Sequence, residues 1–189
     1  MPDERVPLLD LDEANRRATE IHAMGGLADL SIFRILLRNP PVAKAVDGML
    51  RALLFKGKLD PRLRELVIMR IAWRCRSEYE WTQHWTVARR LGVPEADILG
   101  VREWHSHDGY GPTERAVLAA VDDVIDSGRI GPETWEACRA VLGSDEVAIE
   151  LVVAIGNWHM IAGVLASLSV PLEPGVQSWP PDGAEPAVG

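Results

Sequence analysis

The sequence predicts an all-α fold, arranged as a single-domain bundle of helices. Three observations favour this class. Apolar residues recur at spacings of three and four through most of the chain, capping residues and glycines bound these segments, and no alternating apolar and polar run is long enough for a strand. The 189 residues, of which 47% are hydrophobic and 25% charged, suit one globular domain with tails.

Three helices are expected in the N-terminal part of the chain, over residues 12–24, 27–38 and 42–55. The first is polar and ends at Gly25 and Gly26. The second stops at Asn39, because the two prolines that follow disfavour a continued helix. Gly57 closes the third.

The next three helices are expected over residues 61–74, 77–91 and 95–104. Asp60 and Pro61 start the first of them, because an aspartate caps free N–H groups and a proline fits the first helical position. Gly92 ends the second, and Pro94 marks the start of the third.

The last helices are expected over residues 114–127, 131–142 and 144–168, which gives eight or nine in all. Gly128 and Gly143 end the first two of these three, and Ser144 caps the third. The third contains the longest apolar stretch of the chain, but Asn157 and His159 interrupt it. We therefore expect a buried helix rather than a membrane span.

Composition divides the chain into three parts: an N-terminal arm with the first helix over residues 1–26, a helical domain over 27–171 and a tail over 172–189. The tail is rich in proline and glycine, so we expect it to be extended or disordered, with Trp179 docking on a neighbour.

The charge balance bears on the partners. A net charge of −8 argues against a nucleic-acid partner, because phosphate recognition needs clustered lysines and arginines. The first residues are charged and lack the apolar core of a signal peptide. We expect a cytoplasmic protein with neither a membrane nor a nucleic-acid partner.

The chain has two cysteines, Cys75 and Cys138, and no Cys-x-x-Cys pair. A disulfide framework and a metal site built from cysteines alone are therefore excluded, and both side chains are expected to be reduced thiols. The tract from His105 to Asp108 resembles a metal-binding tract, but it falls in a loop flanked by glycine with no fixed partner ligands. We expect a solvated loop there and no metal site.

The residues that suggest chemistry lie around the helix that starts at Ser77. Glu80 and His84 follow at spacings of three and four, which places all three side chains on one helix face. Glu65 lies on the preceding helix and can approach them if the two helices pack antiparallel. Two carboxylates and an imidazole in a poorly solvated site titrate as a coupled group, and burial raises a carboxylate pKa towards neutrality. Such a group can perform general acid–base chemistry.

The alternative interpretation is structural. Glu65 and Glu80 can equally be exposed and paired with nearby arginines, since the same segment contains Arg62, Arg70, Arg74 and Arg76.

The segment around these residues resembles the carboxymuconolactone decarboxylase and alkyl hydroperoxidase D family. Redox members carry a glutamate, then Cys-x-x-Cys, then a histidine four residues after the second cysteine. Glu65, Ser77, Glu80 and His84 fit that spacing, with both cysteines replaced. The resemblance extends over about residues 27–171. It implies an alkyl hydroperoxidase D-like helical fold and a homo-oligomer, trimeric or hexameric.

The replacements change the expected activity. A serine hydroxyl cannot be oxidised as a peroxidatic thiolate is, and a carboxylate cannot resolve a sulfenic acid. The decarboxylase branch carries a glutamate four residues before the histidine, as here. The resemblance thus implies a lyase without metal or organic cofactor, acting on a small carboxylated, lactone-like compound. His84 would transfer the proton, and Glu80 and Glu65 would orient it or share the proton.

Further residues are candidates for substrate binding, each with a structural alternative. Arg70 or Arg74 would bind a substrate carboxylate, or else form a surface ion pair. Ser77 would donate to an oxyanion, or else cap its helix. His159 is a secondary pocket candidate, or else a core or interface histidine.

Two other functions remain open. The protein can be a thiol-dependent peroxidase of the peroxiredoxin type that uses Cys75, or a catalytically silent helical oligomer that binds a small ligand.

Overall fold

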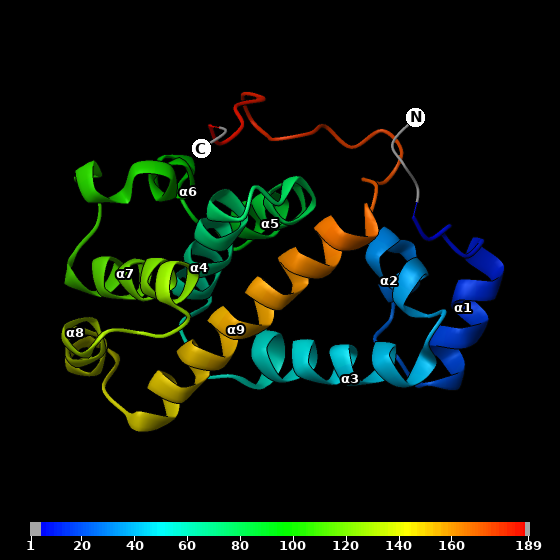
Figure 1. Ribbon diagram of the computed structural model, residues 1–189, viewed down its shortest axis with the longest axis horizontal. Helices are drawn as coiled ribbons and strands as arrows, with labels where there is room; N and C mark the ends of the chain where they lie inside the picture. Colours follow the sequence, from blue (N-terminus) through cyan, green and yellow to red (C-terminus); the bar gives the residue numbers. More distant parts are fainter. Residues whose placement is uncertain (1–4, 188–189) are drawn as a thin grey trace. The chain divides into compact units, whose positions relative to one another are not determined.

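The computed structural model describes residues 5–187, and within that range the regular structure is helical, with no strand (Figure 1). The predicted all-α class is confirmed. The chain forms two compact units: residues 5–57 with Val164–Val176, and Lys58–Gly163 with residues 177–187. The expected boundaries at residues 26 and 171 stay predictions.

The first unit is built from three short α-helices, a 3-10 turn and a π-helical turn: α1 (Leu11–Glu20), η1 (Leu27–Asp29), α2 (Ser31–Leu36), α3 (Pro40–Arg51) and η2 (Ala52–Lys56). Asp10 caps α1, since its side chain accepts a bond from the Glu13 N–H at 2.8 Å. Phe33 and Leu37 are buried in this unit. The predicted helix over residues 27–38 is broken, because Leu30 adopts an extended conformation between η1 and α2.

The second unit contains the remaining elements: α4 (Pro61–Arg74), α5 (Glu78–Arg90), α6 (Glu95–Gly100), η3 (Val101–Ser106), α7 (Pro112–Ser127), α8 (Pro132–Leu142) and α9 (Asp145–Leu168), which belongs to it as far as Gly163. The predicted α4 is confirmed residue for residue, with the Asp60 side chain accepting from the Leu63 N–H at 3.0 Å. Glycines in the left-handed conformation end α7 and α8, at Gly128 (φ 76°) and Gly143 (φ 77°).

The α4 helix lies at the centre of the second unit, where it packs against α5 and α7. Every residue from Leu63 to Ala72 is buried, so α4 has no solvent face. A helix buried all round is normally apolar all round. Arg64, Glu65 and Arg70 depart from that rule, and each must have its charge compensated inside the protein.

One face of the α9 helix is buried and the opposite face is exposed, although both carry apolar side chains. Leu151, Ala154 and Trp158 are buried, whereas Val153 and Met160 are 37% and 49% exposed. By length and composition α9 could cross a membrane, but the same is true of core helices in globular proteins. Its buried Trp158 face is consistent with the expected core helix.

Residues 177–187 have no regular secondary structure and pack against α4 and α5. Trp179 is 4% exposed and packs beside Trp73 and Trp81, with ring centroids 6.1 and 6.0 Å away. The Trp81 indole N–H donates to the Pro180 carbonyl at 2.8 Å. Trp179 therefore docks on its own chain. Residues 188–189 of the expected tail lie outside the described residues.

Candidate active site

A tight turn at residues 75–77 joins α4 to α5 and brings Glu65 against His84. The Glu65 Oε2 atom lies 2.7 Å from His84 Nδ1. Glu65 is fully buried, and the His84 side chain is 16% exposed. The exposed alternative for Glu65 is therefore wrong, and the predicted approach of the two helices is confirmed.

The second oxygen of Glu65 is paired with the residue before it. Arg64 is 6% exposed, and its Nε and Nη2 atoms each lie 3.1 Å from Glu65 Oε1. Glu65 thus has a guanidinium on one oxygen and an imidazole on the other. Both carboxyl oxygens of this buried side chain therefore have a hydrogen-bond partner inside the protein.

Trp158 of α9 completes the surroundings of His84. Its indole N–H donates to His84 Nε2 at 3.2 Å, with the two rings nearly perpendicular at 84°. Because an indole N–H can only donate, Nε2 must offer its lone pair. The proton of the neutral ring then lies on Nδ1, which donates to Glu65. These partners assign the tautomer of His84.

Glu80 lies one helical turn before His84 and is 2% exposed. Neither of its carboxyl oxygens has a hydrogen-bond partner of normal geometry among the described residues. Burial raises the pKa of Glu80 well above its usual value, and the Ser77 hydroxyl opposes this only in part. Burial therefore favours the protonated carboxyl of Glu80 over its ionised form, and the exposed alternative is wrong for Glu80 too.

Ser77 occupies the N-cap position of α5, but its hydroxyl makes no capping bond. It is 8% exposed, and its Oγ has no hydrogen-bond partner of normal geometry within residues 5–187. Ser77 therefore occupies the predicted N-cap position but does not make the predicted capping hydrogen bond. The Ser77 hydroxyl lies beside the Glu80 carboxyl, whose pKa it acts to lower.

Arg70 forms an ion pair within the protein, which was the alternative to binding a substrate carboxylate. It makes two 2.8 Å bonds to Asp122 of α7 and further bonds to the carbonyls of Val101 and Arg102. Although burial works the other way, hydrogen bonds from Arg70 and Trp104 hold the pKa of Asp122 below its usual range. All of Arg70's nitrogens are used inside the protein.

Arg74 donates to Asp122 at 2.8 Å and to Asp126 at 2.5 Å, and its side chain is 26% exposed. Both predicted carboxylate-binding arginines therefore form ion pairs between α4 and α7. The spacing within α4 could not reveal their acidic partners, which lie far along the chain.

His159 does not reach His84. It is exposed on α9, whereas the neighbouring Trp158 faces the core. The core placement of His159 is wrong, and its interface role stays a prediction. The α9 residue that contacts His84 is Trp158, the neighbour of His159.

Cys75 ends α4 and is half-buried. Burial raises the pKa of its thiol to about 11, and the nearby Glu80 carboxyl adds to the effect. The thiol is therefore protonated at neutral pH, and only a thiolate attacks a peroxide readily. Cys138 of α8 has the same raised pKa of about 11 for the same main reason.

Three polar or aromatic side chains at or near the site were missed in the sequence. For Arg64, the only signal in the sequence was its position directly before Glu65. Trp158 had only its position next to the candidate His159 to indicate it. Asn157, beside Trp158, is 7% exposed, and neither atom of its side-chain amide has a partner among the described residues.

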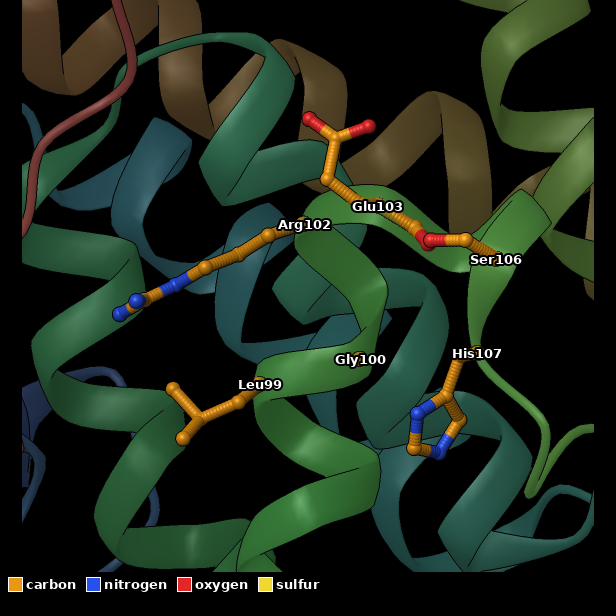
Figure 2. Close-up of a pocket in the computed structure, with 6 residues that line it drawn as sticks. All are labelled: Leu99, Gly100, Arg102, Glu103, Ser106 and His107. Carbon is orange, nitrogen blue, oxygen red and sulfur yellow. The ribbon is translucent and has the colours of Figure 1, made fainter.

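The tract from His105 to Asp108 is more ordered than the expected solvated loop. His107 Nε2 lies 3.2 Å from Asp97 Oδ1, and its ring lies so close to Gly100 that a Cβ there would be 2.7 Å from it. Figure 2 shows this histidine on the wall of a cavity of about 360 Å³, lined also by Leu99, Gly100, Arg102, Glu103 and Ser106. Within residues 5–187, no group of three or more His, Cys, Asp or Glu side chains is placed to hold a metal ion.

Comparison with known proteins adds a family match. Residues 40–123 match the model of the carboxymuconolactone decarboxylase family. This segment contains Glu65, Ser77, Glu80 and His84 but not Trp158. None of the curated proteins compared with the chain matches it.

Several solved structures share the fold. An uncharacterised peroxidase-related protein with the alkylhydroperoxidase AhpD core, from Ralstonia eutropha JMP134, has a TM-score of 0.75 at 19% identity, over 92% of this chain and 94% of that one. A cysteine-to-alanine variant of the debrominase Bmp8, in complex with 2,3,4-tribromopyrrole, has a TM-score of 0.71 at 19% identity, over 92% and 94%. A protein of unknown function from Agrobacterium tumefaciens has a TM-score of 0.68 at 23% identity, over 73% and 94%. At these identities the likeness is one of fold.

Proposed function

The chain belongs, through residues 40–123, to the carboxymuconolactone decarboxylase family, and on that premise we propose that it is a cofactor-free acid–base enzyme. Its reaction is the decarboxylation of a small carboxylated, lactone-like compound. The single observation that carries this proposal is the 2.7 Å contact between His84 and the buried Glu65, one helical turn from the buried carboxyl of Glu80.

Glu80 and His84 of α5 support complementary roles. Burial disfavours the ionised form of Glu80 and so favours a carboxyl that carries a proton. His84 presents Nε2 as a proton acceptor, with Nδ1 committed to Glu65. One donor and one acceptor on neighbouring positions of a helix are what a proton-transfer reaction needs.

The reaction is balanced in atoms and electrons. The bond between the carboxylate carbon and the lactone breaks, CO₂ leaves, and the electron pair stays on the lactone, where conjugation spreads it onto the carbonyl oxygen. A proton then bonds to carbon and restores a neutral product. The net change consumes one proton from solvent.

The exposures of the two groups indicate how that proton arrives. Glu80 is 2% exposed and holds its proton inside the protein, whereas the His84 side chain is 16% exposed and can exchange protons with water. His84 transfers the proton, Glu80 shares it, and Glu65 fixes the imidazole. The Ser77 hydroxyl, which has no hydrogen-bond partner of normal geometry in the described part of the chain, would donate to the developing oxyanion.

The test is CO₂ release from a panel of carboxylated lactones. His84→Gln is expected to lower the rate by about a hundredfold or more, because the proton-transfer group is lost. Cys75→Ser, at the end of α4, is the control and is expected to retain the parental rate.

The outcomes separate the alternatives. Loss of activity in Cys75→Ser with retention in His84→Gln, seen in a peroxide assay, would support the thiol peroxidase instead. Equal behaviour of both variants and the parent in every assay would leave a silent ligand-binding oligomer. The raised pKa of Cys75, about 11, does not favour the thiol reaction.

A further inference from the structure

The surroundings of His84 point to a role for Trp158 that goes beyond packing. We propose that Trp158 is a positioning residue whose indole N–H fixes the orientation and tautomer of His84, with Nε2 as the acceptor and Nδ1 turned towards the buried Glu65 carboxyl. This inference rests on the proposed function in one respect only, namely that His84 is the proton-transfer group.

The first step concerns the chemistry of the contact. The indole nitrogen of Trp158 is a donor and has no lone pair to accept with. Its 3.2 Å bond to His84 Nε2 exists only while Nε2 is unprotonated. A proton on Nε2 would place two N–H groups against each other and remove the bond.

The second step concerns the opposing contact. Nδ1 lies 2.7 Å from Glu65 Oε2, so each ring nitrogen of His84 has its own partner. Arg64 occupies the other oxygen of Glu65 and holds that carboxyl in place. Glu80 is a further titratable group on the same helix as His84, and burial raises its pKa. Trp158 of α9, which contacts Nε2, does not titrate.

The third step is that Trp158 cannot easily move aside. It is 2% exposed and among the largest fully buried side chains of the protein. Its ring centroid lies 5.9 Å from that of His84, in an edge-on arrangement. In a close-packed interior such a ring keeps its orientation, so the N–H remains aimed at Nε2.

The two nitrogens of His84 therefore have fixed and different roles: Nδ1 is turned to Glu65, and Nε2 accepts from Trp158. For a proton-transfer group this is useful, because a proton that reaches Nε2 displaces the indole bond, and that bond forms again when the proton is passed on.

The experiment reads the ring directly by ¹⁵N NMR of histidine-labelled protein without substrate. In the parent at pH 7, His84 is expected to show a protonated Nδ1 and an unprotonated Nε2. In Trp158→Phe, which keeps the aromatic bulk and removes the N–H, the fraction of His84 protonated on Nε2 is expected to rise by about threefold to tenfold.

The chain offers a matched control. The Trp104 indole N–H also makes a buried bond, to Asp122 at 2.9 Å, but does not contact His84. Trp104→Phe should cost similar stability and leave the His84 signals unchanged. A protonated Nε2 in the parent, or identical His84 signals in the parent and Trp158→Phe, would overturn the proposal.

A second measurement needs no variant and covers the case in which Trp158→Phe does not fold. As pH is lowered on the parent protein, the indole proton signal of Trp158 is expected to shift in step with the nitrogen signals of His84, while that of Trp104 does not follow them. Independent movement of the two would contradict the coupling. Because neither readout uses a substrate, failure of the decarboxylase assay leaves this test intact, and the converse also holds.

Discussion

Glu80 is the residue whose protonation most directly affects stability. Both of its oxygens are buried with no hydrogen-bond partner of normal geometry among residues 5–187, and its pKa is raised well above the usual 4.5. A carboxyl group with a raised pKa in the folded state stabilises the fold below its unfolded pKa. That contribution is lost as the pH rises from about 4.5 towards the folded pKa.

Glu80→Gln removes this dependence on pH, because the amide stays neutral. We expect the variant to have a higher Tm than the parent at pH 8 and a similar one at pH 4, while losing most of the proposed activity. Thermal unfolding followed by circular dichroism at both pH values measures the difference. A constant difference in Tm across this range would show that Glu80 does not titrate as its burial predicts.

At the scale of the elements, ion pairs between side chains join α4 to α7, in addition to apolar contacts. Asp122 accepts from Arg70, Arg74 and Trp104, with the Arg70 pair closed by two 2.8 Å bonds. The arginine side chain is 8% exposed and the aspartate 15%. A pair this well buried is costly to break, because the remaining charge stays inside.

Asp122→Asn is therefore expected to lower the free energy of unfolding by about 3 kcal/mol at pH 7. The pKa of Asp122 is lowered, so its contribution is present above the usual 3.8 and is lost as the pH falls through the folded pKa. Urea denaturation at pH 7 and pH 3 should show the difference between variant and parent shrink in acid. Asp126→Asn, whose side chain is 63% exposed, is the control and should change stability by about 0.5 kcal/mol or less.

The helices themselves were accessible from the sequence because their signals are local. Asp60 and Pro61 define the start of α4, and Gly128 and Gly143 define two helix ends. The site was only partly accessible. Spacing placed Glu80 and His84 on one face, but the partners of Glu65 and Arg70 depend on packing between segments that are far apart in the sequence.

At the scale of the whole molecule, α9 leaves an apolar face uncovered. Its members are four large side chains, between 37% and 61% exposed: Ile149, Val152, Val153 and Met160. Contiguous apolar side chains of this kind mark interaction surfaces. We propose that a second copy of the chain covers this face, in line with the homo-oligomer that the family resemblance implies.

The oligomer has a direct test. Val153→Asp places a charge on the exposed face without touching the core, so it is expected to lower the molar mass seen by light scattering from an oligomer to a single chain of 20.8 kDa. Glu136→Lys, an exposed change of charge on α8, serves as the control. A parent that already has the mass of one chain would exclude the oligomer.

The placement of the aromatic residues has an optical consequence. All seven tryptophans and both tyrosines lie in Lys58–Gly163 or residues 177–187. Among the large aromatic residues, the first unit contains phenylalanine alone. Absorbance at 280 nm and indole fluorescence therefore originate entirely in the second unit. The first unit contributes to far-ultraviolet dichroism but is silent in emission, so the two signals together can reveal whether the units melt as one or in sequence.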